Sequence, residues 1–477
     1  MKEYFNTLKE KITSFWIEVK YNKELPSAIM IAVSIVLCMA MGFLFLCPLV
    51  SIRNATLIGL CIVGGIGILL EPYWGVLFVI FLYFLMSCDI KYAPSDTRAI
   101  FYITPVVVGS WLFNMIVKRN FRFVKCWQNI AILGLIAVAY LSTINAVYPE
   151  KSIEDSGVFA KRMLFYLLFL NLIDSFKRLN LAYWIVSGGS GGLALLSIRT
   201  FILGGSMKRV EVGGGQLAGS NALAHMVVMT IPFFFYKIFS KNRLEKIGGI
   251  IFLPISIFSI IATASRGGSI GAGVVLLSLA LTSKKKLKSF LILSGIIWLG
   301  IMFAPPIYWE RMNSIKSYEE DASATHRIDV WKAGIEMWKE HPLIGIGQEN
   351  FQYVVRGYLP WDSKIEQLVP HNTYIKFLAQ GGTIALFSYL LLLFFNFTDL
   401  WRVRKSAKEE FQGINVYNLS RAVEIGLIGH MTSAIFIDKT DFEPFYWFSA
   451  LAALLRYFLK YEDGLAKEDE NLGRVPK

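Results

Sequence analysis

Five cationic side chains lie at the ends of long apolar stretches, where their charge could bind an anion. Lys161 and Arg162 open one stretch, Arg209 lies in a Gly-rich segment between two others, Arg266 occupies a tight turn, and Lys376 lies near the start of another. Ionisable side chains close to lipid are costly and by default mark functional sites. We therefore expect an electropositive outer cavity suited to a phosphate or pyrophosphate group. The alternative is that each side chain extends to ordinary phospholipid head groups.

The turn that contains Arg266 has the composition of an anion site. It reads Ala264-Ser265-Arg266-Gly267-Gly268, which is so short that two helices would meet almost without a loop. Glycines let the backbone approach a ligand closely, and backbone N–H groups can help to bind an anion. As a bare pattern SRGG is short, so a plain turn with a solvated Arg would fit it too.

A polar segment further along the chain predicts a helix that Ser323 caps and that runs to about Glu340. Arg327 lies one turn before Trp331, so its guanidinium could reach the cavity with two donors, or could simply lie on the rim of the helix. The residues expected to form one apolar face recur at three- and four-residue spacing: Ile328, Trp331, Ile335 and Trp338.

His371 is the candidate proton acceptor. It stands in Pro370-His371-Asn372, directly before the apolar stretch that begins at Thr373, and an imidazole can take up a proton near neutral pH. A lone His is more often structural, and His225, His326 and His430 compete for the role. His225 could instead line the cavity from the stretch that begins at Ala218.

The whole composition excludes a water-soluble protein. Hydrophobic residues make up 55% of the 477 residues and charged residues only 17%. The chain contains about fourteen stretches of roughly 17 to 24 apolar residues, the length that a helix needs to cross a membrane. We therefore expect an all-α polytopic membrane protein with about 12–14 transmembrane helices. The stretches begin near Pro26, Asn54, Tyr73, Ile100, Gln128, Val158, Leu181, Ala218, Gly248, Gly268, Ser289, Thr373, Tyr417 and Phe445.

The basic residues assign the topology. The net charge of +13 gathers in alternate short loops, as the positive-inside rule predicts, and this distribution argues against a nucleic-acid-binding protein. We expect cytoplasmic tails at 1–25 and 460–477, the first eleven helices in 26–304 and the last three in 373–459. Residues 305–372 would form one large, partly helical extracytoplasmic loop, which is too long for a simple connector.

Metal and disulfide chemistry find little support in the sequence. The five cysteines contain no CxxC pair, and none lies in the expected outer loop. No convincing DxD motif occurs in the outer segments. We expect neither a metal nor a cofactor.

Five short motifs in order give the chain a resemblance to a known family. They are Gly219-Ser220-Asn221-Ala222-Leu223-Ala224, Ser265-Arg266-Gly267-Gly268, Arg327 with Trp331, His341-Pro342-Leu343-Ile344-Gly345-Ile346-Gly347, and His371-Asn372. In this order, around a large outer loop, they resemble the O-antigen ligase and polymerase family over roughly residues 218–390. The chain departs from the family pattern in the first motif and in having about fourteen spans.

The resemblance implies a membrane-embedded inverting glycosyltransferase of the C fold class in the bacterial cytoplasmic membrane. It would transfer a glycan from undecaprenyl pyrophosphate to an acceptor hydroxyl on the outer face. Arg266 and Arg327 would hold the pyrophosphate and His371 would activate the acceptor, while position alone adds Lys161, Arg162, Arg209, His225 and Lys376 to the cavity. The acceptor would be a growing glycan, a lipid A core or a protein, and a chain-length regulator is a further partner that the resemblance allows.

Two other classes of function remain open at this point. A small-anion transporter, of the bicarbonate-carrier kind, could use an outer cationic site, but the charges lie near the outer face and no internal repeat is evident. A non-catalytic scaffold for glycan export would not need Arg266 or His371 at all. Membrane lipids are partners under every one of these hypotheses.

Overall fold

The computed structural model describes residues 67–68, 71–87, 98–117, 122–204, 209–212, 215–313, 322–360, 368–406, 410–411 and 414–471. The apolar stretches expected from Pro26 and Asn54, and the N-terminal tail, lie outside these residues. Contacts divide the chain at Gly67, so the unit described below is 68–477.

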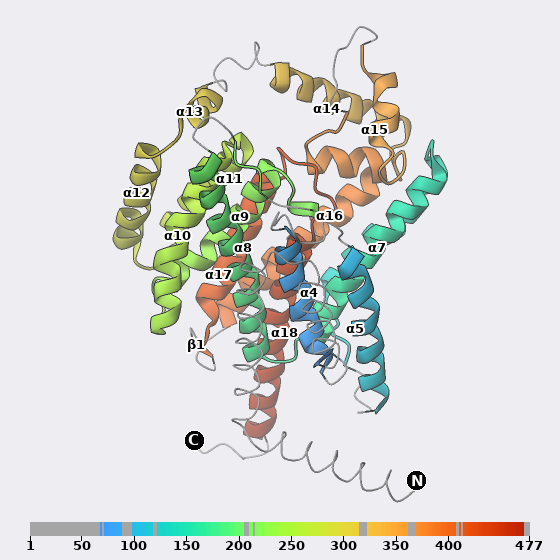
Figure 1. Ribbon diagram of the computed structural model, residues 1–477. Helices are drawn as coiled ribbons and strands as arrows, with labels where there is room; N and C mark the ends of the chain where they lie inside the picture. The colour runs from blue at the N-terminus through green and yellow to red at the C-terminus, as the bar shows by residue number, and fades with distance from the viewer. Residues whose placement is uncertain are drawn as a thin grey trace, which may run out of the picture. The chain divides into compact units, whose positions relative to one another are not determined.

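The described part of the chain is helical almost throughout, as expected (Figure 1). Two short strands, β1 (Glu410–Phe411) and β2 (Ile414–Asn415), pair antiparallel. The 3₁₀ turns are η1 (Ser142–Asn145), η2 (Gly215–Leu217) and η3 (Val355–Tyr358). The α-helices are α4 (Pro72–Ser87), α5 (Arg98–Val117), α6 (Trp127–Leu141), α7 (Pro149–Leu172), α8 (Phe176–Gly204), α9 (Ser220–Lys237), α10 (Arg243–Thr263), α11 (Arg266–Thr282), α12 (Lys286–Met302), α13 (Pro306–Asn313), α14 (Ala322–Glu340), α15 (Phe351–Val354), α16 (Thr373–Ser406), α17 (Val416–Ser433) and α18 (Glu443–Asn471).

These helices follow the predicted apolar stretches closely. The stretches expected from Tyr73, Gln128 and Thr373 correspond to α4, α6 and α16. By length and composition, four helices in the described residues can cross a membrane, or five if α12 and α13, which bend by 102° at their junction, form one span. Shorter apolar helices include α4, α5 and α11. The chain is therefore an all-α polytopic membrane protein.

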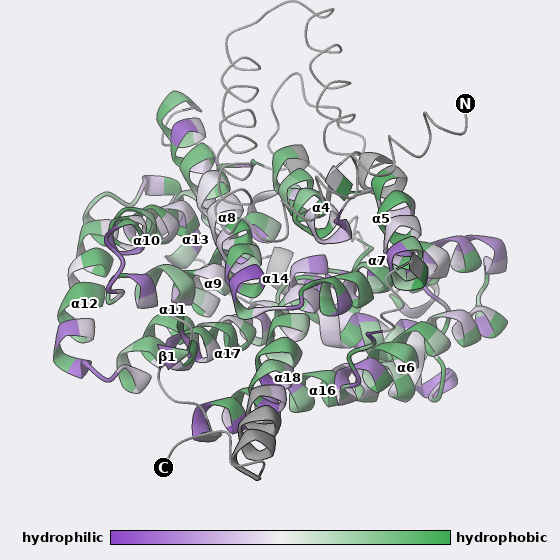
Figure 2. Cartoon of the chain, turned by 90° about the horizontal axis from the view of Figure 1, so that it is seen from below, coloured by the Kyte–Doolittle hydropathy of each residue, from purple (hydrophilic) through white to green (hydrophobic). Residues whose placement is uncertain are grey.

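Apolar side chains face outward along the spanning helices, as lipid contact requires. About half of each spanning window is buried within the protein, between 44% and 56%. The ribbons of α5, α6 and α12 are coloured mostly as hydrophobic in Figure 2. Phe113, Leu133 and Phe290 of these helices are exposed. Lipid would cover these apolar side chains, which a soluble protein would have to bury.

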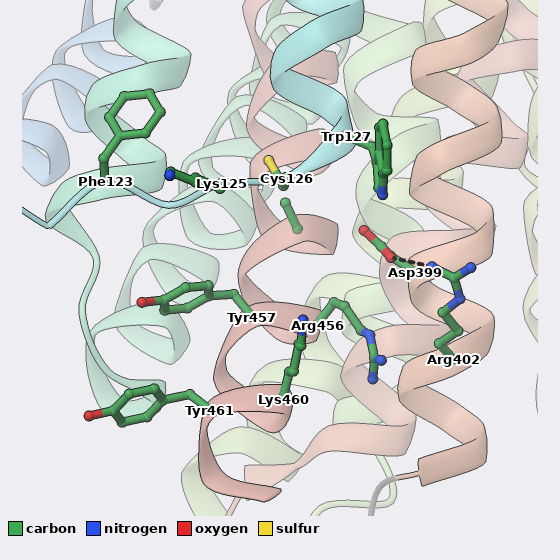
Figure 3. Close-up of a pocket in the computed structure, with 11 residues that line it drawn as sticks. Phe123, Lys125, Cys126, Trp127, Asp399, Arg402, Arg456, Tyr457, Lys460 and Tyr461 are labelled. Atoms are coloured by element: carbon green, nitrogen blue, oxygen red, sulfur yellow. Dashed lines mark ion pairs between the residues drawn. The ribbon is translucent and has the colours of Figure 1, made fainter. Parts of the chain in front are cut away.

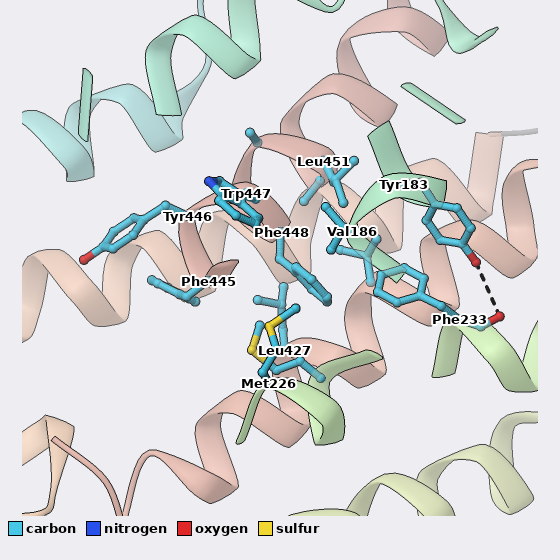
Figure 4. Packing of buried hydrophobic residues seen from close by; sticks show 14 of the residues in the cluster. Tyr183, Val186, Met226, Phe233, Leu427, Phe445, Tyr446, Trp447, Phe448 and Leu451 are labelled. Carbon is cyan, nitrogen blue, oxygen red and sulfur yellow. Dashed lines mark hydrogen bonds between the residues drawn. The ribbon is translucent and has the colours of Figure 1, made fainter. Parts of the chain in front are cut away.

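The interior is centred on α9, α17 and α18. Nearly every residue of α9 is buried, and a helix that is surrounded on all sides must be apolar on all faces. Trp447 and Phe448 of α18 pack here, with Phe448 edge-on to Phe233 of α9 at 5.1 Å (Figure 4). The Tyr183 hydroxyl donates to the Phe233 carbonyl across 3.5 Å.

The helices α13, α14 and α15 lie together at one end of this unit, at the top of Figure 1. Helix α14 ends at Glu340 as predicted but begins at Ala322, so Ser323 lies within its first turn and not ahead of it. Ile328, on the predicted apolar face, is 38% exposed. The buried face is formed instead by Val330, Ala333 and Met337, which share a small core with Ile346, Phe351, Val355, Leu359 and Ala379.

Helix α16 is interrupted at Gly382, whose φ of 66° is not helical. The segment His341–Gly347 repairs the interruption. The amides of Ile346 and Gly347 donate to the carbonyls of Ala379 and Gln380, each across 3.0 Å. In return, Thr383 and Ile384 donate to the carbonyls of Pro342 and Leu343 across 2.8 and 3.2 Å. The His-Pro-Leu-Ile-Gly-Ile-Gly motif thus has a structural role, which satisfies backbone groups that lipid could not.

This repair requires glycine at two places, which gives a first prediction. At Gly382 a Cβ would lie 2.3 Å from the Leu343 carbonyl oxygen, and at Gly345 it would lie 2.4 Å from the Gln380 backbone, both at positive φ. Gly382→Ala and Gly345→Ala should each cost about 1–3 kcal/mol of stability. Thermal unfolding in detergent measures the loss.

Gly273 of α11 is the matched control, since nothing lies within 4 Å of a Cβ placed there. Gly273→Ala should be neutral or slightly stabilising, because Ala favours a helix over Gly. Equal melting temperatures for all three variants would contradict the role assigned to the interruption.

Candidate functional site

Four arginines from four separate segments converge near the end of the molecule that carries α13 and α14. They are Arg209, between α8 and α9, Arg266, Arg311 and Arg327. Burial, the charge of Arg311 and the weaker charges of Arg327 and Arg266 together lower the pKa of the Arg209 guanidinium, although the charge of Glu211 opposes them. The Arg266 Nε atom also donates to the Arg311 carbonyl across 3.2 Å. Concentrated positive charge of this kind suits a multiply charged anion.

Asn221 joins two of the sequence motifs beneath this arginine cluster. Its Oδ1 atom accepts from the Ser265 hydroxyl across 2.8 Å and from Arg209 Nη2 across 3.2 Å. Ser265 also caps α11 by accepting from the Gly268 amide, so Arg266 is the first residue of that helix. Ala264 adopts a left-handed backbone conformation, φ 47°, to end α10 abruptly. The tight turn is therefore built to direct Arg266, and its N-terminal dipole adds positive potential.

His371 is held by its neighbours in a fixed position. The Asn372 side chain caps α16 by accepting from the Tyr374 and Ile375 amides across 2.9 and 3.1 Å. Trp331 Nε1 donates to the carbonyl of the residue before His371, Pro370, across 2.6 Å. This bond connects α14 to the start of α16, and it brings the helical turn that carries Arg327 to the same place as His371.

Asp438, in the loop between α17 and α18, is the partner of His371. Its Oδ1 atom lies 3.2 Å from His371 Nδ1. Burial opposes ionisation of this carboxyl, but the hydrogen bond with His371 and the charge of Lys376 outweigh burial and hold the pKa of Asp438 below its usual value. A carboxylate there favours the proton on Nδ1, which leaves Nε2 to accept another.

Lys376 lies beside this pair and is almost fully buried. Its Nζ atom forms an ion pair with Glu349 Oε1 at 2.7 Å. Of the described non-glycine residues, Ala264, Glu349 and His371 have positive φ. All three belong to the site or contact it, and such conformations persist where the surrounding structure holds them.

The remaining predicted residues take other positions. Arg162 forms ion pairs with Asp441 and Glu443, and Lys161 is exposed on α7. His225 is 1% exposed, and its Nε2 atom lies 3.0 Å from His430 Nδ1 within the helical interior. The structure thus brings Arg209, Arg266 and Arg327 into one group and His371 with Lys376 into an adjoining one.

Sequence reasoning missed Arg311 and Asp438. Arg311 ends a short helix after Pro305-Pro306, in a segment without a recognisable motif. Asp438 lies in a stretch of three acidic residues between the last two spans, and this density of carboxylates so near apolar helices was the available signal. No group of three or more metal-ligating side chains occurs within the described ranges.

The fold and the site define a polytopic membrane protein in which clustered arginines adjoin a histidine–carboxylate pair. Residues 250–390, which include Arg266, Arg327 and His371, match the family model described as O-antigen ligase. The chain is also 25% identical over 324 residues to an O-antigen ligase of Pseudomonas aeruginosa, an alignment that covers 65% of this chain and 74% of that protein. The resemblance to the O-antigen ligase family is confirmed.

The arginine cluster gives a prediction that needs no glycan. Inorganic pyrophosphate should raise the melting temperature of the wild-type protein, because a ligand that binds only the folded state stabilises it. Arg311→Gln and Arg209→Gln should each weaken this binding roughly 10- to 100-fold, the value of one charge-assisted hydrogen bond. Thermal shift against pyrophosphate concentration measures the change.

Lys339→Gln is the control for these variants, because Lys339 is an exposed cation on the same helix as Arg327. It should respond to pyrophosphate like the wild type. An equal response in all the variants would show that the cluster is not the anion site.

Proposed function

We propose that this protein transfers a glycan from undecaprenyl pyrophosphate to an acceptor hydroxyl on the outer face of the bacterial cytoplasmic membrane. The observation that carries the proposal is the arginine cluster beside the His371–Asp438 pair. The similarity to O-antigen ligases supports the reaction class, transfer of a lipid-linked glycan to an acceptor.

The reaction needs a proton acceptor beside the acceptor hydroxyl and cations beside the leaving pyrophosphate. The acceptor hydroxyl gives its proton to His371 Nε2, and its oxygen forms a bond to the anomeric carbon of the donor glycan. The bond from that carbon to pyrophosphate breaks, and the electron pair leaves with the pyrophosphate. Attack opposite the leaving group inverts the anomeric centre. Arg209, Arg266, Arg311 and Arg327 neutralise the growing negative charge, a task that a metal performs in other sites.

The charge distribution supports an outward-facing site. The turn with Arg266 joins α10 to α11. At the opposite ends of these two helices, Lys241 lies in the loop before α10, Lys246 lies in its first turn, and Lys284 and Lys285 lie in the loop after α11. By the positive-inside rule these basic loops are cytoplasmic, and one helix length therefore separates them from the site. The segment 305–372 would then be extracytoplasmic, with α13 and α14 covering the donor pyrophosphate.

The interruption in α16 does not support the alternative function, a small-anion transporter. Transporters use the free backbone groups of broken helices to bind substrate or ions. In α16 the carbonyls of Ala379 and Gln380 are already occupied by the amides of Ile346 and Gly347. The interruption therefore serves the chain's own structure.

Three substitutions test the proposal directly. Arg266→Ala, Arg327→Ala and His371→Ala should each lower transfer by on the order of 10²–10³-fold, since each removes a charge or a proton acceptor needed in the transition state. Arg266→Lys should recover little, because a point charge replaces a bidentate fork poorly. The assay supplies purified protein in nanodiscs with an undecaprenyl-pyrophosphate glycan and resolves the products by gel and mass spectrometry.

Arg243→Ala changes an exposed arginine at the start of α10, the opposite end of that helix from the turn with Arg266, and this control should transfer normally. A ladder of longer lipid-linked glycans would identify a polymerase, and one transfer to an added lipid or protein would identify a ligase. Normal transfer by all three site variants would contradict the roles given to these residues, and no transfer by the wild-type protein would leave the scaffold hypothesis.

Asp438 should act by positioning His371. Asp438→Asn should lower kcat by on the order of 10²–10⁴-fold with little change in KM, because an amide does not fix the tautomer of the imidazole. In a His371→Ala background the same substitution should have almost no further effect, since both act on one step.

Asp329→Asn changes an exposed carboxylate of α14 and should be silent in this assay. Equal losses from Asp438→Asn in the wild-type and His371→Ala backgrounds would assign Asp438 a purely structural role.

A further inference from the structure

A basic cavity lies near the C-terminal end of α16, away from His371 at the start of that helix. Its volume is about 700 Å³, and the segment before α6, the end of α16 and the middle of α18 line it (Figure 3). Arg402 lies about 30 Å along α16 from the interruption at Gly382. The cavity is therefore separate from the arginine cluster.

The charge in this cavity is mostly uncompensated. Its basic residues are Lys125, Arg402, Arg456 and Lys460, and Asp399 is the acidic one. The Asp399 carboxylate accepts from Gln128 across 2.8 Å and lies 3.7 Å from Arg402 Nη1. Within the residues that the structure describes, Lys125, Arg456 and Lys460 form no ion pair. Basic side chains are thus available for an anion.

The walls of the cavity show which kind of anion fits. Trp127 is 60% exposed and stacks on Phe395 at 5.8 Å, and Phe123 and Tyr461 are 49% and 59% exposed. Exposed aromatic rings at a helix end mark the membrane interface. An apolar, lipid-facing wall beside a basic floor matches an amphiphile, with acyl chains along the rings and a phosphate among the cations.

We propose that this cavity binds the phosphate head group of an anionic glycerophospholipid, from the leaflet opposite the glycan-transfer site. Lys125, Arg456 and Lys460 come from two segments that are distant in sequence, α18 and the stretch before α6, and the end of α16 lines the same cavity, so one head group contacts all three. Each of these elements also extends toward the site: α16 follows His371, and α18 begins at Glu443, which pairs with Arg162. The binding itself does not depend on the proposed reaction.

The test compares two triple variants of the full-length protein by native mass spectrometry from detergent. The pocket variant is Lys125→Gln, Arg456→Gln, Lys460→Gln. The control is Lys246→Gln, Lys286→Gln, Lys288→Gln, which removes three exposed charges elsewhere. The probes are phosphatidylglycerol and phosphatidylcholine with identical acyl chains, with inorganic phosphate as a separate arm.

The wild type and the control should bind phosphatidylglycerol more tightly than phosphatidylcholine, and the pocket variant should bind it roughly a hundredfold more weakly. Should the triple variant fail to fold, Lys460→Gln alone should weaken binding about fivefold. Equal binding by the two triple variants, or no preference for the anionic lipid, would overturn the proposal. So would a thermal shift with inorganic phosphate alone that phosphatidylglycerol does not give, because it would identify a site for a free anion.

Discussion

The exchange of backbone hydrogen bonds between α16 and the segment 341–347 is the constraint on which the site depends. An interrupted helix in an apolar environment leaves amides and carbonyls that lipid cannot satisfy, at several kcal/mol for each. The four bonds to this segment remove that cost. They also fix the end of α14, because the segment follows that helix directly, and so Trp331 meets Pro370. The positions of Arg327 and His371 therefore depend on the backbone hydrogen bonds between α16 and the segment 341–347.

The site combines charges of both signs in a way that separates their roles. Asp438 and Glu349 oppose the charges of His371 and Lys376, whereas Arg209 experiences the positive charges of three other arginines. The net positive potential therefore lies on the side of α11, α13 and α14. Asp438 and Glu349 lie on the side of α16 and the loop before α18, whereas Glu211 is a carboxylate whose charge acts on Arg209. The anionic leaving group of the donor would bind on the arginine side, and the neutral acceptor hydroxyl would bind on the side of His371.

Much of this arrangement could be predicted from the sequence, and the failures have physical reasons. The span positions followed from apolar length, which lipid imposes on each helix by itself. The positions of Arg266, Arg327 and His371 followed from motifs next to helix ends. Arg311 and Asp438 could not be found in this way, because their importance comes from contacts between elements far apart in sequence. The apolar face of α14 was predicted from periodicity alone, but the Trp residues of that face donate hydrogen bonds to the carbonyls of Pro370 and Pro342, while smaller side chains fill the core.

The interruption in α16 has a mechanical consequence. The turns before Gly382 contact the small core of α14 through Ala379 and Ile375, and they also contact the main core of the spanning helices through Tyr374 and Phe377. The Thr373 amide donates to the carbonyl of Ala434, the residue that follows α17. These turns therefore join the outer helices to the bundle, and His371 lies where the two meet. A displacement of α14 by an entering donor lipid would be transmitted to the spanning helices through the residues beside the proton acceptor.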